Sequence, residues 1–193
     1  MKRLCVFCGS SRGNSPAFTA AARAHGETLA ARNIELIFGG SHVGLMGVVA
    51  DAVLANGGKV TGVLPRFMDD KELAHPKLTK LHVVETMHER KQLMAELAEG
   101  FVALPGGFGT LEEIFEAITW QQLHLHAYPC GLLNVDGYFD SLLEFLRGAV
   151  AGGFVRPAHF ERLTVAATPT ELLDRFAQFQ PDQSGKWIPS KLI

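Results

Sequence analysis

The sequence predicts a doubly wound α/β fold, with a Rossmann-like, mainly parallel sheet that carries helices on both faces. Short apolar runs bounded by glycine alternate with segments of helical period along the whole chain, which is typical of such a sheet. With 193 residues, 47% of them hydrophobic, the chain can bury one core but is short for two. No linker, repeat or low-complexity block divides it. We therefore expect one domain over residues 1–180 and a flexible tail over 181–193.

The apolar runs and the periodic segments give the expected elements in chain order. Strands are expected at the apolar runs 4–8, 35–38, 59–64, 81–85, 101–104, 131–135 and 163–167. Helices are expected at the periodic segments 16–32, 44–56, 88–99, 111–126, 139–151 and 170–179. Because ligands of doubly wound sheets bind outside the carboxyl ends of the strands, a site is expected in the loops that follow the strands.

Three of these loops are rich in glycine: residues 8–11, 39–47 and 105–110. At such a strand-to-helix turn, backbone N–H groups and the helix dipole can hold a phosphate. Glycine also allows tight turns and close packing without any ligand. Three glycine-rich loops that open at one edge favour a shared crevice, so we take Gly9, Ser10 and Gly40 as candidate substrate-binding residues.

The glycine patterns do not match the common nucleotide motifs. A dinucleotide site requires G-x-G-x-x-G after the first strand and an acidic residue at the end of the second, and neither is present. A Walker A loop requires Gly-Lys-Ser/Thr, whereas Gly58-Lys59 and Gly185-Lys186 precede Val60 and Trp187. The remaining interpretation is a mononucleotide or another small phosphate ester.

Charge and cysteine content exclude several classes of partner. The net charge of −2 comes with scattered Lys and Arg, so we expect no nucleic-acid partner and no membrane surface partner. No apolar run reaches the ~18 residues of a membrane span, and no signal peptide is recognisable. Three cysteines are too few for a disulfide framework and indicate a cytoplasmic protein. We interpret Cys5-x-x-Cys8 as buried strand residues and His124-x-His126 as ordinary helix-end histidines, and expect no metal.

Arg90 is a candidate for binding an anion. It shares a helical stripe with Leu93, Met94 and Leu97, so the 3.6-residue period turns it inward. It also falls in the first turn of its helix, where the macrodipole disfavours a cation by ~0.3–1 kcal/mol. An inward arginine at such a position requires an anionic partner, which could be a structural carboxylate or a substrate.

Glu113 has a structural and a catalytic interpretation. Residues 110–113 match a capping box with Thr110 as N-cap, and the helical period places Glu113 on the polar face of its helix. A residue in the first turn of a helix that follows a strand-end loop nevertheless lies next to the crevice at the carboxyl ends of the strands. The residues alone leave both roles open.

Two motifs identify a resemblance to a known family. Residues 87–91 read Met-His-Glu-Arg-Lys, and residues 105–113 read Pro-Gly-Gly-Phe-Gly-Thr-Leu-Glu-Glu. They match the paired MHxRK and PGGxGTxxE signature of the LOG (Lonely guy) family, the cytokinin riboside 5′-monophosphate phosphoribohydrolases. Shorter matches over 8–11, 44–47, 119–120, 131–138 and 153–155 extend the likeness to all but the last ~30 residues.

The resemblance implies hydrolysis of the N-glycosidic bond of a nucleoside 5′-monophosphate by a Rossmann-like homodimer without metal or organic cofactor. It implies that Arg90 and Glu113 are catalytic. The substrate contacts that it implies are Glu72, Lys91, Gly107, Phe108, Gly109, Thr110, Leu111, Glu112 and Thr119. Because the bond breaks through an oxocarbenium-like sugar, Glu113 would stabilise that cation or activate water, and Arg90 would orient the phosphate or ribose.

The chain departs from the family pattern without losing a catalytic residue. Ser41 stands where many members have a third glycine, Phe108 where tyrosine is common, and His124 where glycine is common. These changes bear on base specificity and on the dimer.

Two alternative functions stay open: a general AMP nucleosidase, and a noncatalytic nucleotide sensor that uses the same loops. A "lysine decarboxylase" label has been used for family members, but no lysine here has a setting suited to pyridoxal phosphate.

Overall fold

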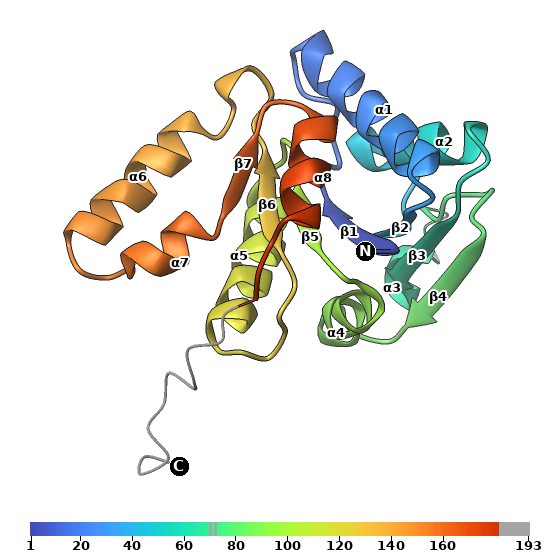
Figure 1. Ribbon diagram of the computed structural model, residues 1–193. Helices are drawn as coiled ribbons and strands as arrows, with labels where there is room; N and C mark the ends of the chain where they lie inside the picture. Colours follow the sequence, from blue (N-terminus) through green and yellow to red (C-terminus); the bar gives the residue numbers. More distant parts are fainter. Residues whose placement is uncertain (70, 72, 182–193) are drawn as a thin grey trace.

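Seven parallel strands form one sheet in the computed structural model, which describes residues 1–69, 71 and 73–181. The strands are β1 (Arg3–Phe7), β2 (Glu35–Phe38), β3 (Val60–Pro65), β4 (Lys80–Val84), β5 (Phe101–Ala103), β6 (Cys130–Leu133) and β7 (Thr164–Ala166). Their order in the sheet is β4-β3-β2-β1-β5-β6-β7. The chain thus builds outward from β1 to β4, then returns to add β5 on the other side of β1 (Figure 1). This reversal puts the topological switch point between β1 and β5.

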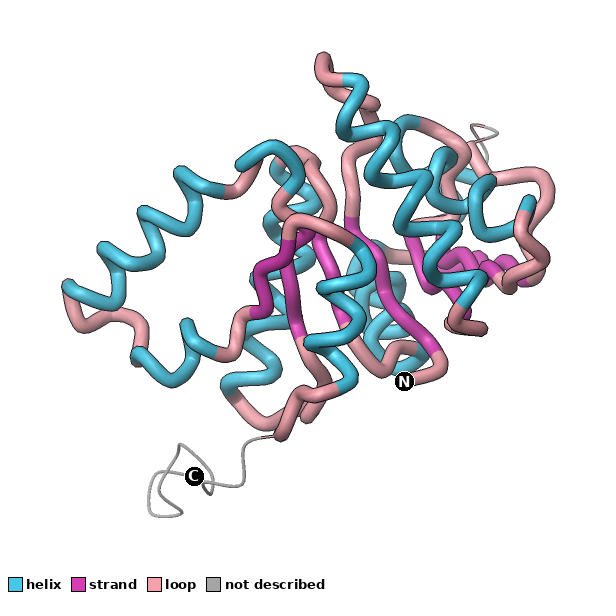
Figure 2. Tube along the Cα trace, turned by 45° about the horizontal axis from the view of Figure 1, so that its top comes forward, coloured by secondary structure: helices cyan, strands magenta, loops and turns pink. Residues whose placement is uncertain are grey.

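The helices connect the strands and cover the sheet on both faces (Figure 2). They are α1 (Pro16–Ala31), α2 (Gly44–Ala55), α3 (Arg66–Asp69), α4 (Met87–Leu97), α5 (Phe108–Gln122), α6 (Asp140–Ala151), α7 (Pro157–Glu161) and α8 (Pro169–Ala177), with the 3₁₀ turn η1 (Val135–Gly137). One core cluster packs α1, α2 and α8 on the sheet, and the second packs α4, α5 and α6 on the opposite face. The doubly wound fold predicted from the sequence is confirmed.

Alternation along β1 shows how the sequence divides its side chains between the two cores. Cys5 belongs to the cluster under α4 and α5, whereas Cys8 belongs to the cluster under α1 and α2. They therefore face opposite sides of the sheet, as expected for residues three apart in extended chain. Burial raises the pKa of both thiols, and all three cysteines are free. The interpretation of Cys5-x-x-Cys8 as structural residues is confirmed.

The predicted elements all exist, with small shifts at their ends. The largest shift is at α5, which begins at Phe108 rather than at residue 111 and ends at Gln122 rather than at 126. It ends early because His124 adopts a positive φ of 56°. Sequence reasoning missed α3, α7 and η1, which are too short to carry a helical period. The predicted tail lies outside the described residues except for Pro181.

The helices α6 and α7 stand out from the sheet beyond β7 (Figure 1). Leu143 is the buried residue of α6, and Phe145 and Phe154 near it are 71% and 90% exposed. No helix in the described part of the chain is long and apolar enough to cross a membrane.

Candidate functional site

The loops after β1 and β5 meet at the switch point of the sheet. The N–H of Gly9 donates to the carbonyl oxygen of Pro105 at 3.0 Å, and the carbonyl of Gly9 accepts from the N–H of Leu45 at 3.0 Å. Gly44 packs so closely on the backbone of Ser10 that a Cβ would have no room there. The three glycine-rich loops predicted to share one edge are therefore in direct contact.

A cavity of about 300 Å³ opens over this junction. Its lining comes from the loops after β1 and β5, the starts of α1 and α2, and the turn after β6: Gly9, Ser10, Ser11, Arg12, Gly13, Phe18, Leu45, Pro105, Gly106, Gly107 and Tyr138. Arg12 is exposed, and none of the described residues forms an ion pair with it. The cavity thus combines glycine backbone with the guanidinium of an exposed arginine.

The backbone donors in the first turn of α5 have no acceptor among the residues that the structure describes. Gly107 is the N-cap and contributes no side chain, and the first bond of the helix runs from the N–H of Leu111 to the carbonyl of Gly107. Among the described residues, none accepts a hydrogen bond from the five consecutive N–H groups of residues 106–110. An uncapped N-terminus of a 15-residue helix is suited to bind an anion through these amides and the helix dipole.

Thr110 is not the N-cap of α5, so the predicted capping box with Glu113 is wrong. The helix begins at Phe108, which puts Thr110 inside its first turn. Its side chain is 4% exposed, and its hydroxyl lies against Gly106, where a Cβ would have no room. A glycine at the N-cap position made the helix start earlier than the Thr-x-x-Glu pattern indicated.

Arg90 and Glu113 form a buried ion pair between α4 and α5. Nη1 of Arg90 donates to Oε1 of Glu113 at 2.7 Å, and the two side chains are 9% and 12% exposed. Nε of Arg90 donates to the carbonyl oxygen of Val63 at 3.1 Å. Nη2 occupies the space that a side chain at position 39 would fill, which explains why Gly39 stands at the end of β2. The inward direction predicted for Arg90 is confirmed.

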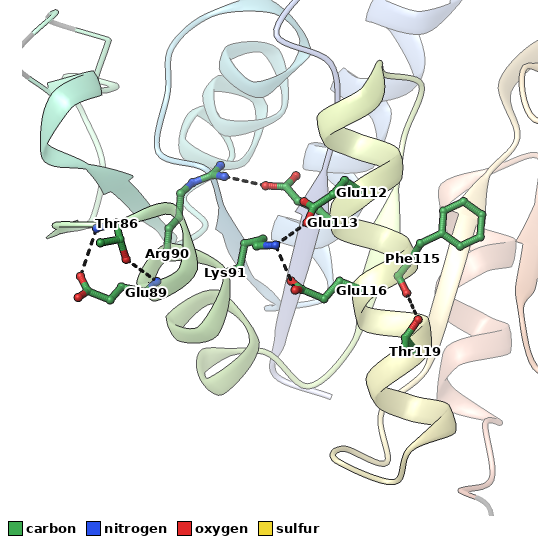
Figure 3. A network of polar contacts seen from close by, with 9 residues as sticks. All are labelled: Thr86, Glu89, Arg90, Lys91, Glu112, Glu113, Phe115, Glu116 and Thr119. Atoms are coloured by element: carbon green, nitrogen blue, oxygen red, sulfur yellow. Dashed lines mark hydrogen bonds and ion pairs between the residues drawn. The ribbon is translucent and has the colours of Figure 1, made fainter.

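Glu113 does not lie on a solvated face, in contrast to the periodicity argument. It points from α5 toward α4, and Arg90 covers it (Figure 3). Burial raises the pKa of the Glu113 carboxyl above its usual value, and the charge and hydrogen bond of Arg90 offset this effect in part. Among the described residues, Oε2 of Glu113 has no hydrogen-bond partner. Arg90 thus occupies only one of the two carboxylate oxygens.

Lys91 forms a second link between α4 and α5. Its ammonium lies between the carboxylates of Glu112 and Glu116, with an Nζ–Oε1 distance of 3.1 Å to Glu116 (Figure 3). Burial acts to lower the pKa of Lys91, but hydrogen bonds to Glu112 and Glu116 raise it above its usual value. The lysine is therefore charged and is held beside the start of α5.

A capping box that sequence reasoning missed fixes the start of α4. The hydroxyl of Thr86 accepts from the N–H of Glu89 at 3.1 Å, and the carboxylate of Glu89 accepts from the N–H of Thr86 at 3.3 Å. The Thr-x-x-Glu pattern at 86–89 was the signal that could have found it. Because Glu89 caps the helix, Arg90 is left to pair with Glu113.

The other predicted site residues lie at different distances from this centre. Phe108 stands at the start of α5 with 95% exposure, and Gly107 and Gly109 beside it have open space around their α-carbons. Gly40 is buried with a positive φ of 79°, and its carbonyl accepts from the N–H of His75 at 2.9 Å. Leu111 packs against the core under α5.

One predicted contact among the described residues, Thr119, is not brought to the Arg90–Glu113 pair. Thr119 lies two turns along α5 from Glu112, about 10 Å along the helix axis, and its hydroxyl donates to the carbonyl of Phe115. Glu72 lies outside the described residues. In the described part of the chain, no group of three or more His, Cys, Asp or Glu residues could hold a metal ion.

Comparison with known proteins agrees with the site motifs. A family described as "Possible lysine decarboxylase" matches residues 46–176. A probable cytokinin riboside 5′-monophosphate phosphoribohydrolase of Oryza sativa subsp. japonica is 46% identical over 180 residues, which cover 93% of this chain and 74% of the rice protein. A cytokinin riboside 5′-monophosphate phosphoribohydrolase of Arabidopsis thaliana is 45% identical over 192 residues, which cover 100% of this chain and 88% of the plant protein.

Solved structures share the fold. A structural genomics target determined by X-ray methods matches with a TM-score of 0.72 and 25% identity, over 93% of this chain and 100% of that one. A molybdenum cofactor binding protein from Rippkaea orientalis matches with a TM-score of 0.69 and 20% identity, over 92% and 97% of the two chains. The latter likeness concerns the fold alone. On the identity to the plant enzymes and the paired motifs around Arg90 and Glu113, this chain belongs to the LOG family of cytokinin riboside 5′-monophosphate phosphoribohydrolases.

Proposed function

We propose that this chain hydrolyses the N-glycosidic bond of cytokinin riboside 5′-monophosphates, which are N6-substituted forms of AMP. The products are the free base and ribose 5-phosphate. The names of its plant relatives describe this activity. The structural observation that carries the proposal is the buried Arg90–Glu113 pair beside the five free N–H groups at the start of α5. This arrangement offers a partly desolvated carboxylate and an anion site at one switch point.

The 5′-phosphate would bind at the start of α5. The N–H groups of residues 106–110 and the helix dipole supply hydrogen bonds and partial positive charge, and the Thr110 side chain adds a hydroxyl close to Gly106. Arg12 lines the adjoining cavity and would add a permanent charge. We therefore retain Gly9, Ser10 and the 107–112 segment as substrate contacts.

Glu113 would act at the anomeric carbon. As the C1′–N9 bond breaks, its electrons go to the base, and C1′ gains oxocarbenium character that a carboxylate can stabilise. Water then adds to C1′, and the proton it loses passes to the carboxylate and on to the leaving base. The free Oε2 and the raised pKa of Glu113 suit it to accept this proton.

Arg90 would hold Glu113 in place and balance its charge. Its guanidinium is fixed at both ends, by the Val63 carbonyl and by Glu113, so the carboxylate has one preferred orientation. Lys91 would neutralise Glu112 and Glu116 and supply positive charge near the ribose phosphate. Thr119 and Glu72 stay predictions from the family resemblance.

Chromatography of reaction mixtures tests the proposed activity. The purified protein is incubated with AMP, with isopentenyladenosine monophosphate and with no nucleotide, each with and without EDTA. Release of isopentenyladenine at a higher kcat/KM than adenine supports the cytokinin assignment, and equal values favour a general AMP nucleosidase. Binding of both nucleotides without release of base would favour a nucleotide sensor. Loss of turnover in EDTA that a divalent metal restores would contradict a metal-free reaction.

We also propose that the chain works as a homodimer. Large apolar side chains are exposed just after α5, on α6 and just after α6: Leu123 (42%), Leu125 (69%), Phe145 (71%) and Phe154 (90%). Exposed apolar side chains of this size are suited to be covered by a second copy about a two-fold axis. Light scattering should give about twice the chain mass of 21.0 kDa. The variant Phe145→Glu should shift the protein toward the monomer mass of 21.0 kDa. A monomeric wild type at micromolar concentration would contradict the dimer.

The cytoplasm is the compartment in which we expect the enzyme to act. All three cysteines are buried and free, which suits a reducing environment.

A further inference from the structure

Tyr138 contacts the glycine-rich loop from an element that neither motif includes. It follows η1 after β6, and its hydroxyl donates to the carbonyl oxygen of Gly106 at 2.6 Å. The same tyrosine lines the cavity over the switch point. The proposed function gives no role to this residue.

The turn after β6 is built to present Tyr138. The side chain of Asn134 accepts from the N–H of Phe139 at 2.7 Å and donates to Asp140 at 2.7 Å. Between them, Asp136 and Gly137 both take positive φ, of 49° and 69°. Positive φ is uncommon for a residue other than glycine, so the backbone here adopts a specific, locally bonded shape.

Aromatic packing fixes the ring of Tyr138 from the side of α1. Phe18 meets it edge to face with a centroid distance of 5.4 Å. Phe18 in turn packs on Gly13, where a Cβ would come within 2.7 Å of its ring. Tyr138 therefore joins the loop after β1, through Phe18, to the loop after β5, through Gly106.

The hydrogen bond from Tyr138 to Gly106 determines where the backbone N–H groups of the loop after β5 point. In a trans peptide the C=O and the following N–H point in opposite directions, and the described chain has no cis peptide. Gly9 holds the carbonyl of Pro105, and Tyr138 holds the carbonyl of Gly106. The N–H groups of Gly106 and Gly107 are consequently turned away from these partners, and no described residue accepts from them.

We infer that Tyr138 is a positioning residue for phosphate binding. By holding the Gly106–Gly107 peptide in one orientation, its hydroxyl keeps the N–H of Gly107 directed to the phosphate before the substrate arrives. Preorganised donors bind an anion without the cost of ordering the loop at that moment. This inference rests on the proposed function and extends it to the end of β6.

The variant Tyr138→Phe tests the inference, because it removes the hydroxyl and keeps the ring against Phe18. Its matched control is Tyr128→Phe, since the hydroxyl of Tyr128 has no partner among the described residues. Turnover is measured with AMP and with adenosine. Affinity for inorganic phosphate is measured by titration of ¹⁵N-labelled protein, with the amide signals of Gly106 and Gly107 as reporters.

Loss of one hydrogen bond predicts a change of about 3- to 10-fold. For Tyr138→Phe we expect KM for AMP and the dissociation constant of phosphate to rise by that factor, with unchanged kinetics for adenosine. The amide signal of Gly107 should shift, the melting temperature should stay near that of the wild type, and Tyr128→Phe should behave as the wild type does.

Other outcomes separate this inference from the proposed function. Equal losses for AMP and adenosine, or unchanged phosphate affinity in Tyr138→Phe, would overturn the positioning role. If the wild type releases no base, the proposed function fails, yet the phosphate titration still decides the role of Tyr138. A wild type that binds no phosphate would overturn the positioning role together with the phosphate site at the start of α5.

Discussion

Arg90 and Glu113 meet across two consecutive helices, α4 and α5, with Nη1 and Oε1 2.7 Å apart and both side chains about nine-tenths buried. Removing both charges from water is costly, and removal of one partner leaves the other charge buried without compensation. A stable core does not need such an ion pair, because apolar residues of similar volume often give the same or greater stability. The pair lies beside the N–H groups at the start of α5, which is consistent with the catalytic role that we propose for it.

Glu113→Gln should lower turnover by at least ~10²-fold, because groups that transfer protons in the transition state contribute about that much. Glutamine keeps the shape and can still accept from Arg90, so the nucleotide should bind almost as well. Since Thr110 does not cap α5, a capping role for position 113 no longer competes with this interpretation. Single-turnover kinetics and equilibrium nucleotide binding provide the measurement.

The exposed Glu27 of α1 offers a matched control for this change. Glu27→Gln alters the net charge in the same way and should leave turnover unchanged. A folded Glu113→Gln protein with turnover near that of the wild type would show that the carboxylate only stabilises Arg90.

The pH profile of kcat/KM should reflect the raised pKa of Glu113. Burial raises this pKa and Arg90 lowers it, so the acidic limb should lie above the usual glutamate range. In Arg90→Gln the lowering effect is lost, and the acidic limb of the residual activity should move to still higher pH. Measurement of kcat/KM from about pH 4 to pH 9 for the wild type and Arg90→Gln tests this shift. A limb that stays in place or moves down would mean that another group controls it.

The fold could be predicted because each strand carries its own local signal. Runs such as Leu4–Cys8 and residues 101–104 are apolar throughout and bounded by glycine or charge, as strands buried on both faces must be. Short elements such as α7 escaped prediction, since five residues do not complete two helical turns. The periodic signal therefore gives the number of strands and long helices but not the irregular turns between them.

Only those features of the site that depend on residues close together in the sequence could be predicted. The glycine loop and the inward Arg90 follow from local pattern, and both are where the pattern put them. The burial of Glu113 depends on α4 lying against α5, a contact between residues 23 positions apart that no periodicity encodes. The bond from Tyr138 to Gly106 spans 32 positions and is equally invisible in the sequence.

Phe108→Ala should reduce activity without affecting stability. Its side chain is 95% exposed, so the folded state loses almost no buried surface when the ring is removed. At the start of α5, however, the ring stands beside the proposed phosphate contacts and can cover the nucleotide. We expect kcat/KM to fall by about 2- to 10-fold, in line with the energy of one aromatic contact, and the melting temperature to stay constant. A destabilised variant, or one with full activity, would contradict this role.

His25→Leu should stabilise the protein in acid. His25 is fully buried in α1, and neither of its ring nitrogens has a hydrogen-bond partner in the described part of the chain. Burial lowers its pKa from 6.5 to about 4. Between these values the unfolded chain binds a proton that the folded chain does not, and stability falls as the pH drops through this window. The wild type should therefore lose up to ~3 kcal/mol relative to His25→Leu between about pH 7 and pH 4.

Urea unfolding at several pH values measures this difference. His88→Leu, at an exposed position of α4, is the matched control and should not show the same pH dependence. Parallel stability curves for the wild type and His25→Leu would mean that the imidazole is protonated in the folded state and finds a partner there.

The 5′-phosphate should be required for catalysis as well as for affinity. The start of α5 binds a group that does not react, and binding energy from such a group can hold the sugar in reactive geometry. Adenosine and isopentenyladenosine should thus have a much lower kcat and a higher KM than their monophosphates.

The variant Thr110→Val removes one hydroxyl from beside Gly106. It should reduce the ratio of kcat/KM for ribotide to kcat/KM for riboside by a few-fold. Because Thr110 is not the N-cap, the variant should keep the helix start and most of its stability, which thermal unfolding checks. Comparable kcat/KM for riboside and ribotide in the wild type would refute phosphate binding by residues 106–110, since their free N–H groups would then contribute nothing to the reaction.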